Sequence, residues 1–108
     1  MNVETDVNEI EILKKALKTW GFAAQENMLY EEIGELLTAI ARFHRGRCTI
    51  EDVVTEIADV MIIVKQMALL YGYDLVIDEK QRKLERLQKR IEADIERRAD
   101  MVSNHLEK

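Results

Sequence analysis

The 108-residue chain contains no proline and only four glycines. All-β proteins need many tight turns, and proline and glycine supply most of them, so these residues are too sparse here for a sheet protein. Hydrophobic residues make up 47% of the chain, which is too apolar for a disordered sequence. A chain of this length normally forms one hydrophobic core. The sequence therefore predicts a single all-α domain.

Apolar residues recur at helical spacing in four segments, and the first three end at or beside a glycine. The expected helices cover residues 5–20, 23–44, 49–72 and 74–101. Thr49 and Asp52 have the spacing of a capping box at the start of the third helix. Residues 102–108 lack an apolar period, so we expect them to form a frayed tail.

The connections between the expected helices are short, which predicts an antiparallel four-helix bundle. Residues 60–64, Val-Met-Ile-Ile-Val, place apolar side chains on every side of the third helix. A helix that is apolar all round must be covered all round, and one layer of four helices does not achieve this. We therefore expect a homodimer or homotetramer, with a face of the third helix or the fourth helix in the interface.

Charge and composition exclude several classes of protein. The formal net charge of −5 argues against a general nucleic-acid-binding protein, which normally presents a net basic face. The longest apolar run, residues 60–64, is far shorter than the roughly 18 residues that span a bilayer. The acidic N-terminal segment lacks the pattern of a signal peptide, and the single cysteine, Cys48, suits a reducing compartment. We therefore expect a cytoplasmic protein with no nucleic-acid or membrane partner.

Two of the expected helices carry acidic residues on faces that should be buried. Glu32 lies within the apolar arc of the second helix, with Glu35 at its edge and Glu31 beside it. Glu56 and Asp59 lie on the apolar face of the third helix. Burying an unpaired carboxylate is costly, and clustered like charges raise one another's pKa. A cation is therefore required to balance these charges.

The register of the two helices predicts a common site. Glu35 lies 11 residues before Gly46 and Glu56 lies 10 residues after it. Each acid is therefore about 15 Å from the turn, and the two should face each other. Carboxylates without histidine or cysteine suit Mg²⁺ or Mn²⁺. The alternative is that the acids form salt bridges with Arg42, Lys65 or bases of the fourth helix.

The acids form an EExxE motif at residues 31–35 and, after a gap of 20 residues, an ExxD motif at residues 56–59. This pair of motifs resembles the MazG-like family of all-α nucleoside triphosphate pyrophosphohydrolases. The resemblance extends from about Trp20 to Arg86 and includes Gln25 before the first motif. It also includes a Lys-Leu-x-Arg segment at residues 83–86.

The resemblance implies Mg²⁺-dependent hydrolysis of a nucleoside triphosphate to the monophosphate and pyrophosphate, with Mn²⁺ as a substitute metal, in clearing or balancing the nucleotide pool. It implies four metal ligands: Glu32, Glu35, Glu56 and Asp59. Glu31 would be a further ligand or the acid that orients the attacking water. Lys83 and Arg86 would contact the phosphates, and Gln25 would contact the nucleobase.

Two other functions agree with the same sequence. One is a non-catalytic bundle in which the fourth helix, with apolar residues at intervals of seven, three and four, pairs with another chain. The other is a degenerate family member that binds nucleotides without cleaving them. Metal binding and pyrophosphate release distinguish these functions from the enzyme.

Two residues near the motifs have open interpretations. We expect Trp20 to anchor the core, with stacking on a nucleobase as the alternative. Gly34, inside the first motif, either leaves room for a ligand or allows two helices to pack closely.

Overall fold

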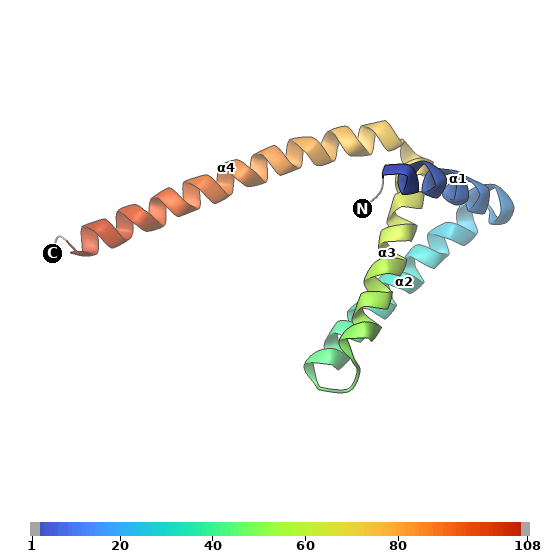
Figure 1. Cartoon of the computed structure of the whole chain (residues 1–108), viewed down its shortest axis with the longest axis horizontal. Coiled ribbons are helices and arrows are strands. Elements are labelled where there is room, and N and C mark those ends of the chain that lie inside the picture. The colour runs from blue at the N-terminus through green and yellow to red at the C-terminus, as the bar shows by residue number, and fades with distance from the viewer. Residues whose placement is uncertain (1–2, 107–108) are drawn as a thin grey trace. The chain divides into compact units, whose positions relative to one another are not determined.

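The computed structural model describes the backbone of residues 3–106 and the side chains of residues 8–106. The helices are α1 (Val3–Trp20), α2 (Phe22–His44), α3 (Ile50–Tyr71) and α4 (Tyr73–Leu106) (Figure 1). The predicted all-α class with four helices is confirmed. None of the helices in residues 3–106 has both the length and the apolar composition of a membrane span.

Single glycines separate two of the helix pairs. Gly21 lies between α1 and α2 with φ 87°, and Gly72 lies between α3 and α4 with φ 129°. Residues with a side chain rarely adopt these values, so glycine lets one helix end and the next begin within one residue. The N–H of Gly21 donates to the carbonyl of Leu17 at 2.9 Å, which closes the last turn of α1.

A capping box begins α3, as predicted from the sequence. The N–H of Asp52 donates to Oγ1 of Thr49 at 3.3 Å, and the N–H of Thr49 donates to Oδ2 of Asp52 at 2.8 Å. These reciprocal bonds satisfy two backbone donors that a helix start otherwise leaves unpaired. They therefore fix where the turn at residues 45–49 ends and α3 starts.

The first compact unit, Met1–Gly72, contains α1, α2 and α3. α2 and α3 form an antiparallel hairpin around the turn, and α1 packs against both (Figure 1). The buried apolar residues are few and come from all three helices: Leu13, Leu17, Ala39, Ile63 and Ala68. Two buried polar residues, Gln25 and Gln66, lie on α2 and α3.

Many apolar side chains of this unit are exposed in the single chain. In the run of residues 60–64, Ile63 is 4% exposed whereas Met61 is 67% exposed. Trp20 is 66% exposed, so the expectation that it anchors the core is wrong. The three helices fully bury only the strips where they meet, and their other apolar side chains are half-buried or exposed in the single chain.

The second unit, Tyr73–Lys108, contains α4. No described residue of α4 is buried. The expected frayed tail is wrong for residues 102–106, which continue α4, and residues 107–108 lie outside the described part. Ion pairs one turn apart support helix without apolar burial, and Arg97 pairs with Asp94 in this way at 2.6 Å.

Candidate metal centre

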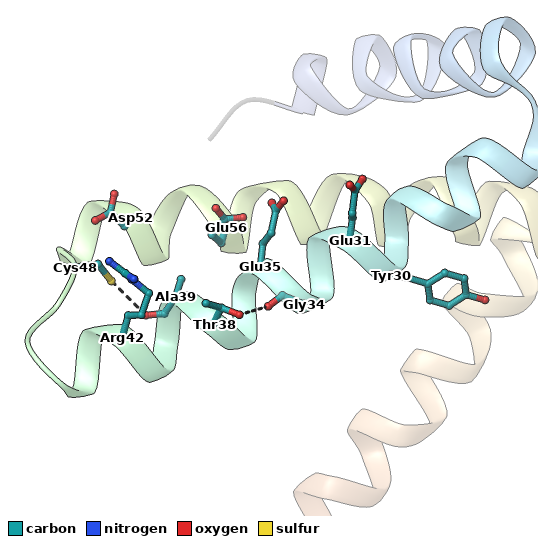
Figure 2. Close-up of a pocket in the computed structure, with 10 residues that line it drawn as sticks. All are labelled: Tyr30, Glu31, Gly34, Glu35, Thr38, Ala39, Arg42, Cys48, Asp52 and Glu56. Carbon is teal, nitrogen blue, oxygen red and sulfur yellow. Dashed lines mark hydrogen bonds between the residues drawn. The ribbon is translucent and has the colours of Figure 1, made fainter.

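The α2–α3 hairpin brings three carboxylates together. Glu32 and Glu35 project from α2 and Glu56 projects from α3, and one oxygen of each lies within 4.8 Å of the others. Figure 2 shows Glu35 and Glu56 side by side across the hairpin. The register predicted by counting residues from the turn is therefore confirmed.

Burial differs among the three glutamates. Glu32 and Glu56 are half-buried, whereas Glu35 is exposed. The Oε2 atoms of Glu32 and Glu56 are both hidden from solvent, and neither has a hydrogen-bond partner among the described residues. A buried polar atom without a partner is unfavourable, and native proteins rarely keep one without a reason. A cation held between the carboxylates would satisfy both oxygens, so these residues fit a metal.

The pKa values show the same unfavourable concentration of negative charge. Burial raises the pKa of Glu32, and the charges of Glu35, Asp59 and Glu56 raise it further. Burial also raises the pKa of Glu56, together with the charges of Glu35 and Asp59. Protonation or a bound cation would relieve this repulsion.

The first unit does not balance this charge with its own bases. Among its described residues, no lysine or arginine forms an ion pair with the three glutamates. Lys65 pairs with Glu9 at 2.9 Å, and an Nη atom of Arg42 donates to the carbonyl of Arg47 at 3.2 Å. Lys65 and Arg42, the two bases of this unit that the sequence suggested as salt-bridge partners of the acids, therefore contact other groups.

A groove of about 630 Å³ runs between α2 and α3 beside the cluster. This volume lies in the range of small-molecule sites. The residues from α2 include Glu31, Gly34, Glu35, Thr38 and Arg42, and those from the turn and α3 are Cys48, Asp52 and Glu56 (Figure 2). Sequence reasoning did not assign Thr38, Arg42 or Asp52 to this groove. The available signal was their spacing, because Thr38 and Arg42 follow Glu35 by one and two helical turns.

The remaining predicted acids lie beside the cluster. Asp59 is half-buried and close enough to influence the pKa values of Glu32 and Glu56, but it is not one of the three residues whose oxygens converge. Glu31 is exposed and lines the groove one turn before Glu35 (Figure 2). The structure thus groups three of the four predicted metal ligands and places Asp59 at their flank.

Gln25, the predicted nucleobase contact, takes part in helix packing. It is buried, and its Nε2 donates to Oε1 of Gln66 at 2.5 Å. It also lines a second hollow of about 390 Å³, together with Trp20, Ala24 and Met28. The exposed Trp20 and the buried Gln25 therefore line the same hollow.

Lys83 and Arg86, the predicted phosphate contacts, lie on α4 in the second unit. Both are exposed, and together with Leu87 and Arg90 they line a small hollow on α4 itself. They are three positions apart in the sequence, so they lie on one flank of the helix.

Comparison of the chain with protein-family models, curated proteins and solved structures found no match. The candidate function therefore depends on the geometry of the carboxylate cluster and on the motifs that the sequence carries.

Proposed function

We propose that the protein is a cytoplasmic, divalent-cation-dependent nucleoside triphosphate pyrophosphohydrolase of the MazG-like type. One observation carries this proposal: Glu32, Glu35 and Glu56 converge, and two of their oxygens are buried without a hydrogen-bond partner among the described residues. A ligand set of carboxylate oxygens suits Mg²⁺ or Mn²⁺. The same three acids belong to the EExxE and ExxD motifs.

Each acid has a role in the proposed reaction. Glu32, Glu35 and Glu56 hold the cation, with Asp59 as the fourth ligand. When bound, Mg²⁺ offsets the repulsion between the carboxylates and the phosphates and polarises the reacting phosphorus. Glu31, at the edge of the groove, orients a water molecule and accepts its proton, which then passes to solvent.

The bonds that change are those at the α-phosphorus of the substrate. The water oxygen bonds to this phosphorus, and the bond from the phosphorus to the α–β bridging oxygen breaks. Pyrophosphate leaves with the electron pair of that bond, and the nucleoside monophosphate keeps the oxygen from water.

Basic and polar residues complete the proposed substrate site. Lys83 and Arg86 contact the phosphates, as the Lys-x-x-Arg resemblance implies. Gln25 and the exposed Trp20 lie at a hollow that suits a nucleobase, since a base offers hydrogen-bonding edges and a stacking face.

We also propose that the chain forms a homodimer or homotetramer in which the helices complete a MazG-like bundle. The exposed side chains of Met61, Ile62 and Val64 on α3 support this. Exposed apolar side chains close together on one helix suit an interface with a second copy.

The test of the enzyme is pyrophosphate release from a panel of canonical and modified nucleoside triphosphates, with Mg²⁺, Mn²⁺ or EDTA. We expect release that requires the metal and yields the matching monophosphate. Glu32→Gln should abolish it, whereas Glu51→Gln should not, because Glu51 is an exposed acid on α3 outside the cluster. A folded protein that releases no pyrophosphate from any substrate would contradict the proposal.

The second candidate is a partner-binding module without catalysis. It is favoured by α4, in which no described residue is buried and an apolar series stays exposed: Leu84, Leu87, Ile91 and Ile95. In that case Mg²⁺ should leave the melting temperature unchanged. A degenerate family member would instead bind a nucleotide with Mg²⁺ and release no pyrophosphate.

A further inference from the structure

The groove between α2 and α3 has two chemically different ends. Glu31, Glu35 and Glu56 line one end. Arg42, the only basic side chain among the described residues of the groove, lines the other end beside Asp52 (Figure 2). Arg42 follows Glu35 by seven residues on α2. This spacing corresponds to about 10 Å along the helix and a rotation of only about 20°, so both residues lie on one face.

Arg42 is held in place by the turn. One Nη atom donates to the carbonyl of Arg47 at 3.2 Å. Hydrogen bonds from Thr49 lower the pKa of Asp52 most, and the charge of Arg42 lowers it further. Because both the N–H and the hydroxyl of Thr49 donate to Oδ2 of Asp52, this carboxylate serves the capping box.

The guanidinium of Arg42 keeps donors for a ligand. A guanidinium carries five N–H donors, and the Arg47 carbonyl engages one of its nitrogens. No carboxylate lies within ion-pair distance of Arg42 among the described residues. Thr38, which lies between Glu35 and Arg42, donates its hydroxyl to the carbonyl of Gly34 at 2.9 Å (Figure 2). Arg42 is therefore the strongest anion-binding group in this part of the groove.

We propose that Arg42 binds the terminal phosphate of the substrate and makes the groove selective for nucleoside triphosphates over monophosphates. This inference rests on the proposed function, because it takes the carboxylate cluster as the place of the reacting phosphate. A polyphosphate is anionic along its whole length, and arginine binds phosphate with two parallel hydrogen bonds. A nucleoside monophosphate held at the cluster ends before Arg42.

The order of residues along α2 gives the substrate a direction. Gln25 precedes Glu32 by seven residues, whereas Arg42 follows Glu35 by seven residues. With the nucleobase toward Gln25 and the reacting phosphate at the cluster, the other two phosphates extend toward Arg42. Arg42 then holds the pyrophosphate group and stabilises the negative charge that it takes on leaving.

The test is calorimetric titration of inorganic pyrophosphate into the protein with Mg²⁺ present. Arg42→Gln should weaken pyrophosphate binding about tenfold or more, because a charged hydrogen-bonded contact is lost. The matched control is Arg45→Gln, which removes an exposed arginine of the same turn that does not line the groove. Affinity in the control should change by less than about twofold. Arg42→Lys keeps the charge and should recover part of the loss.

Hydrolysis assays separate this inference from the proposed function. If the wild type hydrolyses triphosphates and Arg42→Gln keeps wild-type affinity for pyrophosphate and wild-type KM, the role of Arg42 is overturned while the enzyme assignment stands. If the wild type neither binds pyrophosphate nor hydrolyses any triphosphate, both are overturned. Arg42 is exposed, so the variant should fold, which circular dichroism verifies.

Discussion

The side-chain amide of Gln25 on α2 donates a hydrogen bond to the side-chain oxygen of Gln66 on α3, with 2.5 Å between the nitrogen and the oxygen. Both residues are buried. A buried donor that loses its acceptor keeps its desolvation cost. We therefore expect Gln66→Leu to lower the free energy of unfolding by about 1–3 kcal/mol, measured by urea denaturation.

The double variant Gln25→Leu with Gln66→Leu is the control for this prediction. It removes both polar groups and leaves no unpaired amide, so it should regain most of the stability lost in the single variant. A double variant as unstable as the sum of the two single variants would show that the hydrogen bond is not the cause.

The raised pKa of Glu32 predicts an unusual dependence of stability on pH in metal-free solution. The folded protein binds the proton of the Glu32 carboxyl more tightly than the unfolded chain does, in which the pKa of Glu32 is 4.5. The stabilisation that comes from protonated Glu32 is complete below pH 4.5. It is lost as the pH rises through the higher pKa that Glu32 has in the folded state. Relative to the wild type, Glu32→Gln should therefore gain stability from pH 4.5 toward neutrality. Urea midpoints measured in EDTA at several pH values check this, and parallel curves for the two proteins would contradict it.

Divalent cations should stabilise the folded protein. A ligand that binds only the native state contributes about 2.7 kcal/mol at a concentration 100 times its Kd. We expect Mg²⁺ or Mn²⁺ to raise the Tm of the wild type, and Glu35→Gln to remove most of this increase. Glu51→Gln should keep the increase, and an equal increase in all three proteins would indicate nonspecific binding.

Gly34 has open space where a side chain would project. A Cβ built at this position meets no atom within 4 Å among the described residues, so close packing of another helix of the first unit does not explain the glycine. Glycine in a helix costs about 0.5–1 kcal/mol relative to alanine. Gly34→Ala should therefore stabilise the protein by this amount in thermal denaturation. It should also raise the KM for a nucleoside triphosphate, because Gly34 lines the groove.

A matched variant on the same helix calibrates the result for Gly34. Ala41 is exposed on α2 and does not line the groove. Ala41→Gly should lose about the stability that Gly34→Ala gains, with no change in KM. An unchanged KM in Gly34→Ala would mean that the ligand does not use the open space.

The parts of the site that follow from regular helix geometry could be predicted from the sequence. Glu35 and Glu56 meet because each lies nearly the same number of residues from the turn, and a helix rises by a constant amount per residue. Thr49 and Asp52 form the expected capping box because their spacing alone selects that geometry.

Other features depend on details that helical spacing does not contain. Asp59 lies on the expected face, but whether its oxygens join the cluster depends on side-chain rotamers. The Gln25–Gln66 hydrogen bond could not be predicted from spacing either, because amide side chains are common in helices and local packing decides which of them pair. Trp20 has the period of a core residue, yet burial requires that another helix cover that face.

The extension of α4 through residues 102–106 was missed for a different reason. An apolar period identifies helices that are buried along one face, and this stretch has none. Charged and amide side chains sustain the helix just before it, as Gln88 with Glu92 and Asp94 with Arg97 illustrate.

The three converging glutamates belong to two helices that are adjacent in sequence and joined only by residues 45–49. Closing such a short loop takes well under a microsecond, and contacts between neighbours in sequence are formed early in folding. We therefore expect the repelling carboxylates, which are 21 to 24 residues apart in the sequence, to approach one another early in folding. If so, we expect the hairpin to fold faster with a cation that binds these carboxylates than without one.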